Sequence, residues 1–184
     1  EHLQTAMLAG ARTMLPALAI LWMAWSLNEL IGEPKDGFER LGTANYLSGH
    51  NEKNISLSWL PTAVFLLSAF VAFSTGTSWG TMGILTSLVV KTAWDVTGGS
   101  SAEDLNNPIF LASVGAVLAG AIFGDHCSPI SDTTILSSQA SGCDHMAHVR
   151  TQIPYALSVA AVAVVLGTIP VGFGFSVWIC LPVG

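Results

Sequence analysis

Two carboxylates and four hydroxyl side chains lie in the short polar stretch Gly124–Thr134, which directly follows an apolar run. The carboxylates are Asp125 and Asp132, and the hydroxyls belong to Ser128, Ser131, Thr133 and Thr134. Carboxylate and hydroxyl oxygens are hard ligands that suit a small hard cation. Burial disfavours the ionised form of a carboxylic acid, so a partly dry Asp can hold a proton when it holds no cation. The pattern predicts a site at which a cation and a proton compete for one carboxylate.

Of the two carboxylates, we expect Asp132 to matter more, because Ser131, Thr133 and Thr134 surround it with oxygens. Asp125 ends the apolar run, where backbone N–H groups can satisfy it as an ordinary helix-end residue. The alternative for the whole stretch is a loop in water that binds no ion. A charged side chain below the lipid headgroups costs a few kcal/mol, so two carboxylates beside an apolar run favour an ion site over that alternative.

A second polar stretch, Ser74–Thr81, has Ser, Thr or Gly at seven of its eight positions. It interrupts the 37 uncharged residues between Lys53 and Lys91. As one helix these residues would be about 55 Å long, against about 30 Å for the hydrocarbon layer of a bilayer. The segment must therefore break, and a helix, a polar break and a second half-helix are expected.

Paired interruptions of apolar segments are the best sequence indication of the binding site of a transporter. We therefore expect oxygen ligands from the second stretch as well, at Thr75, Thr77 and Ser78. Glycine and proline mark the expected breaks in the two stretches, at Gly76, Gly80, Gly124 and Pro129.

A transition-metal site is the competing interpretation, with Zn²⁺ held by Cys143, His145 and His148. The two histidines have helical i, i+3 spacing, but neither a CxxC nor an HExxH pattern is present. A polar connector in water explains these residues more simply. An intramembrane hydrolase is weaker still, because spacing alone defines no Ser–His or Asp–Asp pair.

The composition of the whole chain is that of a membrane protein. Of 184 residues, 51% are hydrophobic and only 10% are charged, against about 25% charged in a typical soluble domain. A net charge of −6 with six basic residues excludes a cationic nucleic-acid footprint. Long uncharged runs predict four or five membrane passages, the first at Thr13–Ile31, with an extramembrane loop at about residues 32–56.

Four stretches resemble the NhaC-type sodium/proton antiporter family. Gly124–Ser138 resembles its long signature, and Thr75–Met82 resembles its other marked stretch; Cys143–Ala156 and Met14–Ala17 also match in order and spacing. One departure is Ser87, where the family pattern has a proline.

The resemblance implies a multi-pass protein of the wider ion-transporter group that exchanges Na⁺ for H⁺. Relatives that couple Na⁺ or H⁺ to malate and lactate, or that exchange amino acids, supply the alternative function. A non-transporting membrane subunit with the Cys/His metal site is the further alternative. Family members are longer than 184 residues, so we expect the chain to be the C-terminal part of such a transporter.

Together these observations predict an all-α polytopic membrane bundle with two discontinuous or re-entrant elements meeting near the midplane. Residues 1–184 would form a single transmembrane transport domain in the cell membrane. The protein is expected to be a secondary transporter rather than an enzyme, and to need no cofactor, with Na⁺ and H⁺ as transported ions. The expected partners are membrane lipid, the remainder of the transporter chain and a second copy in a homodimer, without nucleic acid.

Overall fold

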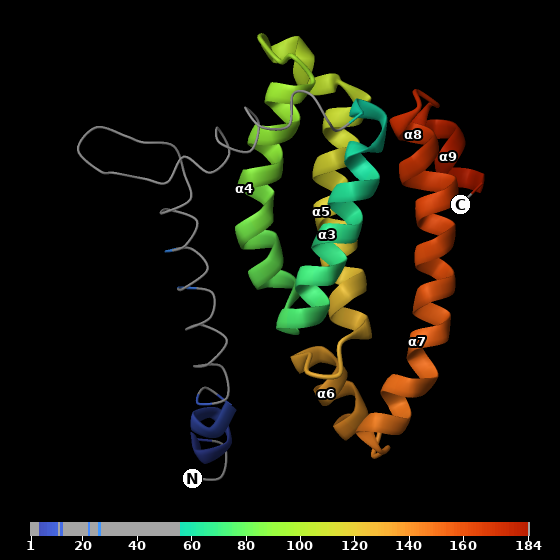
Figure 1. Ribbon diagram of the computed structural model, residues 1–184. Coiled ribbons are helices and arrows are strands. Elements are labelled where there is room, and N and C mark those ends of the chain that lie inside the picture. The colour runs from blue at the N-terminus through green and yellow to red at the C-terminus, as the bar shows by residue number, and fades with distance from the viewer. Residues whose placement is uncertain (1–3, 11, 13–21, 23–25, 27–55, 184) are drawn as a thin grey trace.

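The computed structural model describes residues 4–10, 12, 22, 26 and 56–183 (Figure 1). In this part of the chain the regular elements are helices and no strand occurs, as the sequence predicts. The predicted first membrane helix, Thr13–Ile31, and the predicted loop of residues 32–56 lie outside the described residues, apart from single positions.

Helices α3 and α4 form an antiparallel hairpin (Figure 1). After a short 3₁₀ turn, η1 (Leu57–Trp59), α3 spans Leu60–Thr75, and α4 spans Ser78–Val96. Gly76 ends α3 in the left-handed conformation, with φ 69°, and its N–H donates to the carbonyl of Ala72. A left-handed residue at a helix end favours glycine. Only two residues, Gly76 and Thr77, therefore separate the two helices.

Helix α5 (Pro108–Cys127) follows the short helix η2 (Ala102–Asn106) and packs closely against α3. Asn107 caps its first turn, because the Asn107 side chain accepts hydrogen bonds from the backbone N–H groups of Ile109 and Phe110. Glycines on α5 permit the close packing with α3, since a methyl group at Gly124 would overlap the carbonyl oxygen of Ala69. The apolar core lies between α3, α4 and α5, with Phe65, Val89 and Val117 among its buried members.

The remaining chain leaves α5 at its lower end in Figure 1 and returns along one long helical run. Helix α6 spans Asp132–Ala140 and α7 spans His145–Val162. The run continues through a π-helical turn, η3 (Ala163–Thr168), into α8 (Ile169–Gly172), and α9 (Val177–Val183) follows. The Thr168 hydroxyl lies 3.1 Å from the Thr62 hydroxyl of α3, which joins the end of this run to the bundle.

Three of the described segments are long and apolar enough to cross a membrane: Leu57–Thr75, Pro108–Cys127 and His145–Gly172. Bulky apolar side chains such as Leu66, Phe70 and Leu118 are exposed on the outside of the bundle. Lipid would cover such side chains, so length and composition both indicate a membrane protein.

The interruptions differ from the sequence expectation in length. The first comprises only Gly76 and Thr77 instead of Ser74–Thr81, and the second comprises residues 128–131 instead of Gly124–Thr134. Helix α4 has 19 residues and is therefore a full helix, not a short half-helix. The midplane position of the two interruptions stays a prediction.

Candidate functional site

The two interruptions of the helical bundle lie against each other. A Cβ atom at Gly76, in the first, would come within 2.8 Å of the carbonyl oxygen of Ile130, in the second. The buried hydroxyl of Ser128 donates a hydrogen bond of 2.8 Å to the carbonyl of Phe73 in the last turn of α3. Four helix ends thus meet here: the C-terminal ends of α3 and α5, and the N-terminal ends of α4 and α6.

Asp125 lies at this meeting point. It belongs to the last turn of α5 and is only 5% exposed, and it is the one charged side chain buried among those that the structure describes. The hydroxyl of Ser78, the first residue of α4, donates to Oδ2 of Asp125 at 3.1 Å. The hydroxyl of Thr133, in the first turn of α6, makes a longer contact of 3.5 Å with the same oxygen. Ser131 supports Thr133, because their hydroxyl oxygens are 2.8 Å apart.

The structure thus brings four of the predicted site residues together: Asp125, Ser78, Thr133 and, one contact further away, Ser131. The other predicted hydroxyls have structural partners or lie elsewhere. Thr75 bonds within α3, to the carbonyl of Val71 at 2.9 Å, and is exposed. Thr77 caps α4 by accepting the N–H of Gly80 at 3.3 Å. Ser128 joins the second interruption to α3, and Thr134 is buried within α6.

Asp132 does not hold the position expected from the sequence. It is the first residue of α6 and is exposed, whereas Asp125 is buried. The helix of the apolar run continues to Cys127, so Asp125 remains in α5, where its side chain contacts Ser78 of α4 and Thr133 of α6. Asp132 comes after the turn, where water reaches it. Burial and contacts therefore favour Asp125 as the ion-binding carboxylate. The sequence expectation, which is based on neighbouring oxygens, favours Asp132 instead.

Two of the four expected breaks are not breaks. Gly76 and Pro129 do lie in the interruptions, but Gly80 lies in the first turn of α4 and Gly124 lies inside α5. Gly80 is the third residue of α4, and its N–H donates to the Thr77 side chain that caps this helix. At Gly124 the missing side chain lets α5 approach the backbone of α3, which is a packing role and not a break.

The Cys/His group has a different arrangement from a metal site. Both ring nitrogens of His145 contact protein oxygens. Its Nε2 is 2.7 Å from the carbonyl oxygen of Pro129, and its Nδ1 is 3.1 Å from the Ser138 hydroxyl. Cys143 is exposed and directs its thiol toward the carbonyl of Ser138. Among residues 56–183, no three His, Cys, Asp or Glu side chains come close enough to hold a metal ion.

Sequence reasoning named His145 only as a zinc ligand and missed its contact with the second interruption. Its partner Pro129 is 16 residues away, and nothing in the local pattern indicates that the two meet. The carbonyl of Phe73 was missed for the same reason, since a backbone acceptor leaves no trace in residue types.

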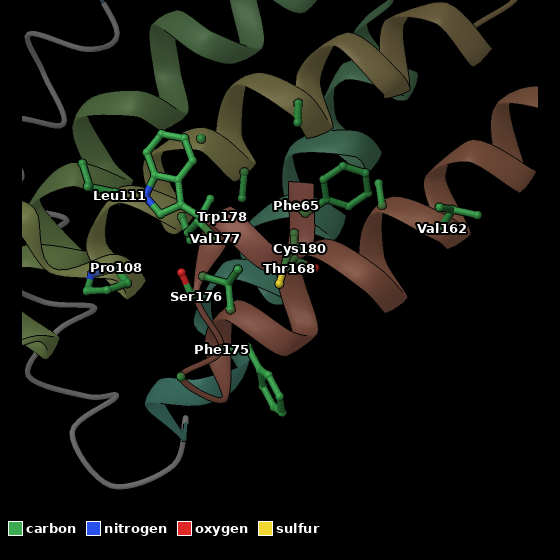
Figure 2. A pocket seen from close by; sticks show the side chains of 18 of the residues that line it. Phe65, Pro108, Leu111, Val162, Thr168, Phe175, Ser176, Val177, Trp178 and Cys180 are labelled. Atoms are coloured by element: carbon green, nitrogen blue, oxygen red, sulfur yellow. The ribbon is translucent and has the colours of Figure 1, made fainter. Parts of the chain in front are cut away.

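A large apolar cavity of about 1270 Å³ lies apart from the carboxylate, between α5, the α7–α8 run and α9 (Figure 2). Its wall on α5 is made of small residues that include Ala112, Gly115 and Ala119, and Trp178 of α9 lies on another side. No charged side chain lines it. This cavity has the chemistry of a helix-packing or lipid-facing groove and not that of an ion site.

Comparison with known proteins identifies the family. A model of the Na⁺/H⁺ antiporter family matches residues 1–173. A Haemophilus influenzae protein named as an uncharacterized Na⁺/H⁺ antiporter is 39% identical over 85% of this chain and 31% of its own length. The malate-2H⁺/Na⁺-lactate antiporter of Bacillus subtilis is 33% identical, covering 94% of this chain and 33% of its own. The Na⁺/H⁺ antiporter NhaC of Alkalihalophilus pseudofirmus is 28% identical, covering 82% and 29%.

The chain thus spans about a third of the length of the curated relatives it matches. No solved structure matches it. The three relatives described above are named as antiporters, and the resemblance to NhaC-type proteins seen in the sequence is confirmed. The chain belongs to the Na⁺/H⁺ antiporter family.

Proposed function

We propose that this chain contributes the ion site of a secondary antiporter that exchanges Na⁺ for H⁺ at Asp125. The observation that carries the proposal is a buried carboxylate that receives a hydroxyl from the start of α4 and another from the start of α6. Oxygen ligands of this kind suit a small hard cation. A carboxylate oxygen that holds a cation can bind a proton in its place, so the two ions would compete for Asp125.

The helix ends around Asp125 support a single positive charge as the occupant. Each helix carries about half a positive charge at its N-terminus and half a negative charge at its C-terminus. The two N-terminal ends, of α4 and α6, therefore offset the two C-terminal ends, of α3 and α5. What is left is the single negative charge of Asp125, since water screens the exposed Asp132. One Na⁺ or one H⁺ neutralises this charge, and the two cannot do so together.

Because Na⁺ and H⁺ compete for one carboxylate, binding of one ion requires release of the other, which gives obligatory exchange. Both are transported ions, and the proposal needs no cofactor. The family and the names of the relatives support the proposal. Placement across the cell membrane in several passes, with the remainder of a longer transporter and a second copy as partners, belongs to the same proposal.

The test is Na⁺-driven proton flux in liposomes that contain the full-length protein, followed with a pH-sensitive dye inside the vesicles. Asp125→Asn keeps the side-chain volume and one oxygen but cannot exchange a proton, so it is expected to abolish coupled flux. Asp144→Asn is the matched control: Asp144 caps α7 through the N–H of Ala147, and Asn caps helices as well as Asp does.

Loss of exchange in Asp132→Asn with wild-type exchange in Asp125→Asn would move the site to the exposed carboxylate. Wild-type exchange in both variants would refute a carboxylate mechanism in this part of the chain. For the wild type, the apparent Na⁺ half-saturation is expected to rise as the pH falls, because protons compete for the same oxygen.

Exchange of an organic anion such as malate is the second candidate, and the 33% identity with the malate/lactate antiporter over 94% of this chain favours it. In that case an anionic substrate would have to compete with Asp125 for the N-terminal ends of α4 and α6. The same vesicles decide the matter, since proton flux that requires malate outside or lactate inside would replace simple Na⁺/H⁺ exchange.

A further inference from the structure

The imidazole of His145 is the one side chain of α7 that forms a hydrogen bond with the second interruption in the described part of the chain. Its Nε2 lies 2.7 Å from the carbonyl oxygen of Pro129, and its Nδ1 lies 3.1 Å from the Ser138 hydroxyl of α6. A carbonyl oxygen can only accept a hydrogen bond. The hydrogen must therefore sit on Nε2, in the neutral ring as well as in the charged one.

Pro129 lies between two residues that hold the site together. On one side, the Ser128 hydroxyl donates to the carbonyl of Phe73 and so joins the interruption to α3. On the other side, the Ser131 hydroxyl contacts Thr133, whose hydroxyl reaches Oδ2 of Asp125. Holding the carbonyl of Pro129 therefore determines where both of these hydroxyl contacts are placed.

We propose that His145 is a positioning residue of the ion site, which acts by donating its Nε2 hydrogen to the Pro129 carbonyl. It touches neither Asp125 nor the ion, and it holds the four-residue interruption in the conformation that brings Thr133 to the carboxylate. The inference rests on the proposed function for its transport readout. It goes beyond that function because it connects the start of α7 with the binding site.

The chemistry of the side chains provides a sharp test. The amide nitrogen of Gln reaches the position of Nε2 in His, and that of Asn reaches the position of Nδ1. His145→Gln therefore keeps a donor for Pro129, His145→Asn keeps only a polar group near Ser138, and His145→Ala keeps neither. His148→Gln, one turn further along α7, is the matched control for loss of an imidazole.

The first readout is the apparent Na⁺ half-saturation for proton flux, measured on the full-length protein in liposomes. The Ala and Asn variants are expected to raise it about threefold to tenfold, as the loss of one hydrogen bond would, with a smaller effect on the maximal rate. His145→Gln and His148→Gln are expected to stay within twofold of the wild type. A general loss of stability would lower the maximal rate through loss of active protein and would not separate Gln from Asn.

The second readout does not depend on transport. Hydrogen–deuterium exchange of the peptide covering residues 126–134 is expected to be about threefold to tenfold faster in the Ala and Asn variants and unchanged in His145→Gln. If His145→Ala does not fold, the comparison of Gln with Asn still decides. Equal protection in the Gln and Asn variants, or rescue by Asn instead of Gln, would overturn the inference. A wild-type protein without Na⁺/H⁺ exchange would overturn the proposed function alone.

Discussion

Gly124 offers a direct test of how the packing of α3 against α5 places the site. It precedes Asp125 in the last turn of α5. A methyl group at this position would overlap the carbonyl oxygen of Ala69 and would lie 2.9 Å from Cβ of Ala72. Carbon atoms in ordinary contact are about 3.5–4.0 Å apart. In Gly124→Ala, the contact with Cβ of Ala72 alone requires α5 to move away from α3 by about 0.6–1.1 Å, and the overlap with the Ala69 oxygen requires at least as much.

The expected effect on stability is the difference of two contributions. Alanine stabilises a helix by about 1 kcal/mol relative to glycine, whereas overpacking a close interface costs about 1–3 kcal/mol. Gly124→Ala is therefore expected to lower the free energy of unfolding by up to about 2 kcal/mol. Its effect on transport is expected to be larger, since a displacement of about 1 Å beside the reacting group can lower a rate about 100-fold.

The measurements are thermal unfolding in detergent and Na⁺-driven proton flux in liposomes. Gly115→Ala is the matched control, because it makes the same change in the same helix at a position where no atom lies within 4 Å of the new methyl group. The control is expected to be neutral or up to about 1 kcal/mol more stable. If the two variants unfold at the same temperature and transport at the same rate, the close approach of α5 to α3 does not determine the geometry of the site.

Two further predictions concern helix ends. Thr77→Val removes the side-chain oxygen that accepts the N–H of Gly80, so it is expected to destabilise the protein by about 1 kcal/mol, whereas Thr77→Ser should not; equal unfolding temperatures would contradict this role. Asp104 accepts the backbone N–H groups of Ser100 and Ser101 at 2.8 Å each, and these bonds hold the pKa of the Asp104 carboxyl below its ordinary value. These bonds therefore order the loop around Ser100 and Ser101 fully at pH values above the ordinary pKa of an Asp carboxyl. This order is lost as the pH falls through the lowered pKa of Asp104. Asp104→Ala should abolish this order at every pH, which faster amide hydrogen exchange of the loop would show and unchanged exchange would contradict.

The elements of the bundle were predictable because their signals are local. Long uncharged runs identify apolar helices, and the cluster of small polar residues around Gly76 identifies the end of α3. The extent of each interruption was not predictable in the same way. Ser74 and Thr75 stay helical, with their hydroxyls bonded to carbonyls of the preceding turn, at Phe70 and Val71, so residue type alone overestimates the length of the break.

The identity of the buried carboxylate depends on tertiary packing. The sequence surrounds Asp132 with more oxygens than Asp125, yet the packing of the helix ends removes Asp125 from water and leaves Asp132 exposed. The contact between Ser78 and Asp125 joins residues 47 positions apart. A single sequence shows that oxygens are abundant in both stretches, but not which of them converge.

The long helical run from His145 to Gly172 has a mechanical consequence. Only 11% of its most apolar window is buried, against 44% for the windows in α3 and α5. In the described part of the chain, the hydrogen bonds that join it to other elements are at its two ends: His145 holds Pro129 and Ser138, and Thr168 meets Thr62. His145 and Thr168 are 23 positions apart, a separation that spans about 35 Å of helix, close to the thickness of a bilayer. The run is therefore held by hydrogen bonds at both ends and packs lightly in its middle. A displacement of the middle would be transmitted to both ends of the bundle together.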